Sequence, residues 1–120
     1  MIKSYEDLEV YKRSYRLALE LHKTTLKFPA HEKYELGSQI RRASKSIPLN
    51  IGEGYGKRLS SDEFKRFLSM AIGSCDEMKI LLDFAKDLDY LEQARYLELK
   101  ERYQVLGKML YRLHQNWQTK

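Results

Sequence analysis

Cysteine and proline are scarce in this chain of 120 residues, which has one cysteine, Cys75, and two prolines. A single cysteine excludes an internal disulfide and is typical of a reducing compartment. No run of about 18 apolar residues is present, so the sequence predicts no membrane-spanning helix. The first residues also lack the apolar core of a signal peptide. We therefore expect a cytoplasmic protein with no membrane partner.

Strand patterns, internal repeats and low-complexity segments are also missing. Charged residues make up 32% of the chain and hydrophobic residues 42%, a balance that suits a helix-rich protein with amphipathic faces. Apolar residues recur at helical spacing in four segments. These predict helices over about residues 5–27, 32–56, 61–88 and 90–117. Short connections between long helices predict an all-α, antiparallel, up-down four-helix bundle that forms one domain over residues 1–120.

Capping patterns predict where the helices begin. Ser4 with Asp7, Ser60 with Glu63, and Asp89 with Glu92 have the spacing of a capping box, in which two side chains satisfy backbone donors reciprocally. We expect these pairs to start the first, third and fourth helices. Pro29 should end the first helix, because it disfavours helical geometry at the residue before it.

The first helix carries two apolar stripes, where a monomeric bundle core needs one. The stripes are Leu8, Tyr11, Tyr15 and Ala18, and Val10, Leu17, Leu21 and Phe28. The surplus stripe predicts either a wide buried face or an interface with a second chain. We expect a homo-oligomer.

The second helix contains a proline and a glycine-rich end. Pro48 cannot donate to the Ser44 carbonyl, so we expect a kink there. Gly52, Gly54 and Gly56 should loosen the end of the helix and allow close packing. We expect Glu53, between two of these glycines, to pair with Arg41, Arg42 or Arg58, or to accept backbone donors freed by Pro48.

Positive charge is concentrated around this helix. The formal net charge is +5, and residues 33–58 alone contribute +4. A concentrated basic surface favours polyanions, nucleic acid first. The candidate phosphate contacts are Arg41, Arg42, Lys45, Lys57 and Arg58, and Tyr55 is a candidate for stacking on a base. A solvated surface that keeps the protein soluble explains the same charge, and both interpretations stay open here.

Residues for catalysis are few. His22, His31 and His114 lie on three different segments, and no Glu-x-x-His pair of a di-iron bundle occurs. Cys75 lies on an apolar seam, where cysteine is usually an inert small hydrophobe. The glycine run at residues 52–56 lacks the Gly-Lys-Ser/Thr ending of a phosphate loop. We therefore predict no catalytic residue, no metal ligand, no cofactor and no enzymatic activity.

Several motifs together resemble one family. They are YEDLEVY (5–11), FPAHE (28–32), QIRRA (39–43), SIPLNIGEG (46–54), FKRFL (64–68) and AIGS (71–74). In this combination and order the chain resembles the S23, or 23S rRNA intervening-sequence, proteins. Two departures are mild: family members often have Trp at the place of Tyr11 and Ala at the place of Gly52.

The resemblance implies a four-helix bundle that often assembles as a ring-like homopentamer. It also extends to the accessory variability protein of diversity-generating retroelements, which binds nucleic acid and a reverse transcriptase through a basic surface. We therefore expect a non-enzymatic nucleic-acid-binding or scaffold protein, with RNA a better candidate than DNA. The alternative is an adaptor for an acidic or reverse-transcriptase-like protein partner, with no direct role in binding nucleic acid.

Overall fold

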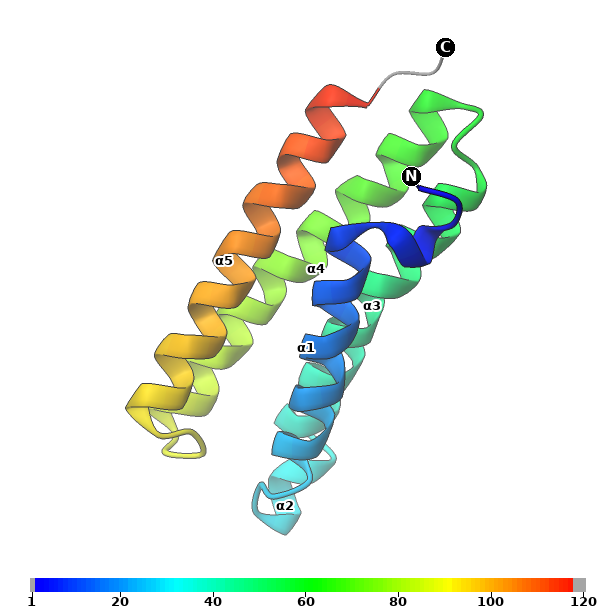
Figure 1. Ribbon diagram of the computed structural model, residues 1–120. Coiled ribbons are helices and arrows are strands. Elements are labelled where there is room, and N and C mark those ends of the chain that lie inside the picture. The colour runs from blue at the N-terminus through cyan, green and yellow to red at the C-terminus, as the bar shows by residue number, and fades with distance from the viewer. Residues whose placement is uncertain (1, 118–120) are drawn as a thin grey trace.

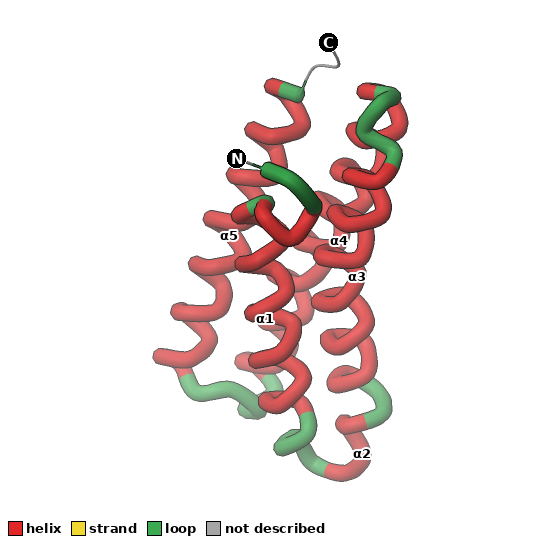
Figure 2. Tube along the Cα trace, turned by 45° about the vertical axis from the view of Figure 1, so that its right-hand side comes forward, coloured by secondary structure: helices red, strands yellow, loops and turns green. Residues whose placement is uncertain are grey.

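The computed structural model describes residues 2–117, and these residues form an all-α four-helix bundle (Figure 1). The four long helices run alternately up and down, as predicted. They are α1 (Glu9–Thr25), α3 (Leu36–Gly56), α4 (Ser61–Asp87) and α5 (Gln93–Asn116); a short 3-10 helix, η1 (Tyr5–Asp7), precedes α1, and a single turn, α2 (Ala30–Lys33), precedes α3. The connecting loops gather at the two ends of the bundle (Figure 2).

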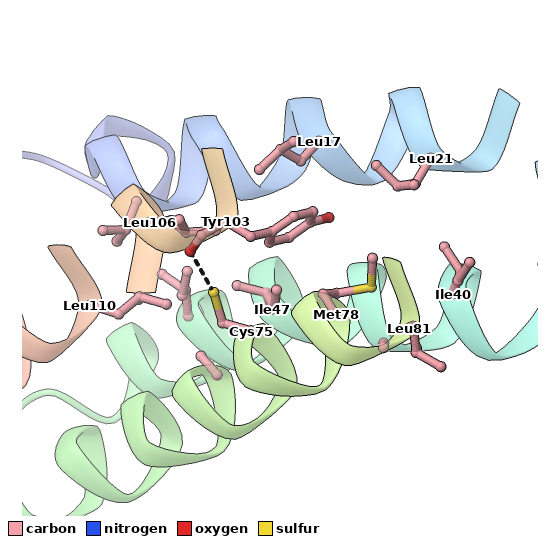
Figure 3. Packing of buried hydrophobic residues seen from close by; sticks show 14 of the residues in the cluster. Leu17, Leu21, Ile40, Ile47, Cys75, Met78, Leu81, Tyr103, Leu106 and Leu110 are labelled. Atoms are coloured by element: carbon pink, nitrogen blue, oxygen red, sulfur yellow. Dashed lines mark hydrogen bonds between the residues drawn. The ribbon is translucent and has the colours of Figure 1, made fainter. Parts of the chain in front are cut away.

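One apolar stripe from each long helix fills the core. Leu17 and Leu21 of α1 face isoleucines of α3, and Met78 of α4 lies opposite Tyr103 of α5 (Figure 3). The core side chains with at most 1% of their surface exposed include Leu17, Leu21, Ile40, Ile47, Ile51, Phe64, Met78, Leu82, Leu99, Tyr103, Leu106 and Leu110. The stripe of α1 that contains Leu17 and Leu21 is therefore the buried one.

The start of α1 differs from the prediction. Ser4 and Asp7 do form a capping box, but it closes η1. Leu8 then adopts an extended conformation, with φ −72° and ψ 129°, and its side chain is buried. Inserting Leu8 into the core requires this break, so α1 begins only at Glu9.

The second predicted helix is divided near its start. Tyr34 and Glu35 have non-helical backbone angles and separate α2 from α3, which begins at Leu36 rather than near residue 32. From there α3 continues through Pro48 to Gly56. The glycines therefore do not loosen its end. Gly54 is buried against α4, where a Cβ atom would lie 2.5 Å from the Phe67 Cβ, so it allows the two helices to approach closely.

The remaining two caps have different outcomes. Ser60 accepts the backbone N–H of Glu63 at 3.2 Å and caps α4, as predicted, although the Ser60 N–H donates to the Lys57 carbonyl instead of the Glu63 side chain. The Asp89 cap is wrong. Asp89 has a positive φ of 66° within the loop, and the residue before α5 is Glu92, which makes no side-chain cap.

Candidate nucleic-acid interface

The five predicted phosphate contacts do not form one site. Arg41, Arg42 and Lys45 lie in the first half of α3, whereas Lys57 and Arg58 follow its last turn. Lys57 is twelve positions after Lys45, which corresponds to about 18 Å of helix. A ligand that touches both groups must therefore be long.

Arg41 has a structural role. Its guanidinium donates to the Thr25 hydroxyl at 2.9 Å and to the Lys33 carbonyl at 2.6 Å, and its side chain is only partly exposed. These bonds join the end of α1 to the turn before α3. Because Arg41 is turned toward its own bundle, it is a poorer phosphate ligand than its neighbour Arg42.

Arg42 and Lys45 are exposed, and neither side chain has a hydrogen-bond or salt-bridge partner in residues 2–117. Arg42 faces a hollow of about 330 Å³ between α3 and α4, which Glu77 also lines. Lys45 lies on the other side of α3, beside α1. The two cations are therefore free to reach an anion, but from adjacent faces of the helix.

A second basic group surrounds the α3–α4 turn. The Arg58 guanidinium lies 4.2 Å from the centroid of the Tyr55 ring and donates to the Tyr55 carbonyl, and the Lys57 ammonium lies 5.9 Å from the Phe67 ring. The Arg66 guanidinium also lies over the Phe67 ring, 4.7 Å from its centroid. Tyr55 itself is 6% exposed, so the expectation that it stacks on a base is wrong.

The prediction for Glu53 is also wrong. Glu53 is exposed and forms no salt bridge or hydrogen bond through its side chain with any residue in the described part of the chain. It follows Pro48 by five residues and lines the space between α1 and α3 that Lys45 also lines. It is the carboxylate nearest to Lys45 on the same helix, and it lowers the positive charge of this surface.

An apolar groove of about 660 Å³ runs between α1 and α3, and we call it the α1–α3 groove. Tyr15, Leu19 and Leu49 line it and are 50%, 49% and 61% exposed. Leu8 and Ala18, which belong to the surplus stripe of α1, are buried instead. The surplus stripe is thus partly absorbed by the core, and Tyr11 and Tyr15 remain as its uncovered part.

A second groove, of about 770 Å³, lies between α4 and α5, and we call it the α4–α5 groove. Lys108, Tyr111 and Arg112 line it, and all three are exposed. The sequence analysis passed over these residues because it counted charge only over residues 33–58. The available signal was the end of the sequence, where Lys108 and Arg112 lie in a stretch, residues 102–120, that contains no acidic residue.

Cys75 and the histidines give no catalytic arrangement in the described residues. The Cys75 thiol is fully buried and donates to the Tyr103 carbonyl at 3.1 Å (Figure 3), and burial raises its pKa to about 12. His22 lines the α1–α3 groove, whereas His114 contacts Ser69. No cluster of three or more His, Cys, Asp or Glu suited to a metal ion occurs within residues 2–117.

The described helices are too short or too polar to cross a membrane.

Comparison with solved structures finds the same fold in a protein of unknown function from the S23 ribosomal protein family of Bacteroides thetaiotaomicron. The TM-score is 0.81 at 20% identity, over 89% of this chain and 96% of that one. No curated protein matches the chain. The model of the 23S rRNA-intervening sequence proteins matches residues 6–112, and the chain therefore belongs to this family.

Proposed function

We propose that this protein is a non-enzymatic nucleic-acid-binding or scaffold protein, with RNA a better ligand than DNA. The observation that carries the proposal is the state of Arg42, Lys45, Lys57 and Arg58, which are exposed and form no salt bridge in the described residues. By contrast, Arg102 is paired with Glu20 and Lys100 with Asp83. Free cations can replace the counterions of a polyanion, and the released counterions supply the binding free energy.

This mode of binding implies low sequence specificity. The cations are spread over two faces of α3 and the α3–α4 turn, so they fit phosphates along a backbone better than the edges of bases. Phosphate contacts fix position and orientation but do not read sequence. We expect structured RNAs of different sequence to bind with similar affinity.

Self-association would extend the basic surface. We propose that the α1–α3 groove is covered by a second copy of this chain, because exposed apolar patches of this kind usually mark an interface. Apolar side chains on the exposed face of α4 could fill the apolar groove of a second copy. Ile80 and Phe84 are 57% and 56% exposed, and Glu77 precedes them on the same face. The α1–α3 groove of one copy would receive Ile80 and Phe84 of the next. Because the two surfaces are different, the contact is head-to-tail, and it closes into a ring when the rotation between copies allows it. Five subunits is the number that the family resemblance implies.

Filter binding of a structured RNA at two salt concentrations tests the proposal. We expect micromolar or tighter binding at low salt that weakens steeply at higher salt. Arg42→Gln with Lys45→Gln should lower the salt dependence, since each lost phosphate contact removes about 0.9 from the slope of log affinity against log salt. The matched control is Lys23→Gln with Lys27→Gln, which removes the same charge elsewhere. Lys23 is exposed on α1, and Lys27 is exposed just after the end of α1. No binding at low salt, or binding that ignores salt, would contradict the proposal.

The alternative is an adaptor for an acidic or reverse-transcriptase-like protein. The α1–α3 groove with the free Lys45 beside it favours this second candidate. It predicts that RNA does not bind at low salt while an acidic partner encoded nearby does. A reverse transcriptase gene with template repeats in the gene neighbourhood would support this reading.

A further inference from the structure

The α4–α5 groove has a composition unlike that of the α1–α3 groove. Its lining is mainly long polar side chains from two adjacent helices. Those that matter for recognition are Lys79, Gln104, Lys108, Tyr111, Arg112 and Gln115. Ammonium, guanidinium and amide groups donate hydrogen bonds, so the groove is built for an anion with many acceptor oxygens.

The cations of this groove are not neutralised equally. Lys79 forms a salt bridge with Asp76 at 3.0 Å, and Asp76 is the only acidic residue that lines the groove. Lys108 and Arg112 have no salt bridge or side-chain hydrogen bond within the described residues. They are four residues apart on one helix, so their attachment points lie about 6 Å apart along the axis of α5. The groove therefore keeps two free positive charges side by side.

Tyr111 adds an aromatic surface to the same groove. Its side chain is 59% exposed, and its ring makes no aromatic contact with another described residue. An exposed ring beside free cations is the arrangement with which proteins stack single-stranded bases and track the phosphate backbone. A duplex would offer phosphates to the cations but would keep its bases out of reach of Tyr111.

An acidic protein helix fits this groove less well. Such a helix docks through apolar anchors that enter an apolar groove. Here Ile72 is the one aliphatic side chain in the lining, so an apolar anchor would find few apolar side chains to pack against. The exposed cations instead favour a ligand with a charged backbone.

We propose that the α4–α5 groove binds a single-stranded segment of nucleic acid. Lys108 and Arg112 contact consecutive phosphates, and Tyr111 stacks on a base. This inference rests on the proposed function and assigns it a second surface, separate from Arg42 and Lys45 on α3. Long RNA could then contact both surfaces with its paired and unpaired parts.

Fluorescence anisotropy with a labelled oligouridylate, and with the corresponding oligodeoxythymidylate, tests the phosphate contacts. The full chain carries Lys108→Gln with Arg112→Gln. The matched control is Lys12→Gln with Arg16→Gln on α1, an exposed pair with the same spacing and no salt bridge that lies outside the α4–α5 groove; the tyrosine between them, Tyr15, is stacked on Tyr11. We expect the α5 variant to lower the salt slope by about 1.4, because each single-strand contact contributes about 0.7. The control should keep the wild-type slope.

Tyr111→Ala tests stacking separately from charge. It should weaken oligouridylate binding about tenfold or more, since the stacking of one base contributes that much, and Tyr111→Phe should restore it. Binding of inorganic polyphosphate, which has no bases, should be the same for wild type and Tyr111→Ala. Equal losses of affinity for oligouridylate and polyphosphate would overturn the stacking role. Circular dichroism of the same samples checks that Tyr111→Ala is still folded.

Three outcomes separate this inference from the proposed function. If the wild-type chain binds neither oligonucleotide nor structured RNA at low salt, both fail. If structured RNA binds but the α5 variant and its control behave alike with oligouridylate, the α4–α5 groove is not the site and the proposed function stands. If an acidic peptide binds the wild-type chain but not the α5 variant, and no oligonucleotide binds either chain, the ligand of the groove is a protein and the inference is wrong.

Discussion

The Arg102 guanidinium donates two parallel hydrogen bonds to the Glu20 carboxylate, Nη1 to Oε1 at 2.9 Å and Nη2 to Oε2 at 2.5 Å. Arg95 donates a third, to Oε1 at 3.1 Å. These bonds cross from α1 to α5, on the side of the bundle where these two helices make few other contacts. Charge-assisted, bidentate pairs of this kind are among the strong hydrogen bonds in proteins, so this cluster ties the first helix to the last.

Acid should loosen this tie. The hydrogen bond from Arg102 is the main reason that the pKa of Glu20 is lowered to about 2, against 4.5 for a free glutamate. A lowered pKa in the folded state contributes stability above pH 4.5, and the contribution is lost as the pH falls from about 4.5 to about 2. Glu20→Gln should therefore flatten the loss of stability over this window, as measured by urea unfolding at several pH values.

At pH 7 the same variant should be less stable. A third of the surface of both side chains is exposed, so we expect a cost of about 1–2 kcal/mol after allowing for solvent screening. Glu9→Gln is the control, because Glu9 pairs with Arg13 four residues away on the exposed face of α1 and its loss should cost no more than about 0.5 kcal/mol. Equal effects of the two variants would show that the Glu20 cluster is an ordinary surface pair.

Two glycines in the bundle should respond to alanine in opposite directions. Gly54→Ala places a methyl group 2.5 Å from the Phe67 Cβ, and overpacking of this kind costs about 1–3 kcal/mol. Gly73 lies within α4 with nothing within 4 Å of the new Cβ, so Gly73→Ala should stabilise the helix by about 0.5–1 kcal/mol. Thermal unfolding of both variants checks the pair, and a gain for Gly54→Ala would mean that α3 and α4 can separate at little cost.

The Cys75 thiol should be unreactive in the folded protein. Burial raises its pKa to about 12, whereas the unfolded thiol ionises near 9, so the folded state disfavours the reactive thiolate. Iodoacetamide at pH 8 should label Cys75 only after unfolding, and mass spectrometry would show it. Because the unfolded thiol loses its proton first, the chain should also lose stability as the pH rises above about 9. Rapid labelling of the native chain would reopen the question of a nucleophile.

The fold could be predicted from the sequence because the apolar stripes of the helices determine which faces are buried. Ile40, Ile47 and Ile51 recur at helical spacing and are all fully buried, so the period alone locates the core face. The ends of helices were less predictable, because they depend on local competition. Leu8 leaves helical geometry to enter the core, and Asp89 has the spacing of a cap but lies in a turn with positive φ.

The candidate site was less predictable than the fold. Arg41 and Arg42 are adjacent in the sequence, yet one bonds Thr25 of α1 and the other is free. A helix turns by about 100° per residue, so neighbours along the chain meet different surroundings, and those surroundings are known only once the neighbouring helices are placed. The density of charge near residues 33–58 therefore located basic residues without separating structural from free ones. It also passed over Lys108 and Arg112, although the sequence has no acidic residue after Glu101.

The last prediction concerns self-association through the α1–α3 groove. Leu49 is 61% exposed in this groove, and Leu97 is 54% exposed on α5, outside it. Leu49→Ser and Leu97→Ser thus remove the same side chain from two surfaces of similar exposure, and both should leave the monomer fold intact. If a second copy covers the groove, Leu49→Ser loses about 1.5–3 kcal/mol per interface, which repeats at each contact of a closed ring. Light scattering after size exclusion should then show smaller species for Leu49→Ser at micromolar concentration and the wild-type mass for Leu97→Ser. A wild-type chain that is a clean monomer under these conditions would contradict the interface, and a ring of another size would contradict only the number five.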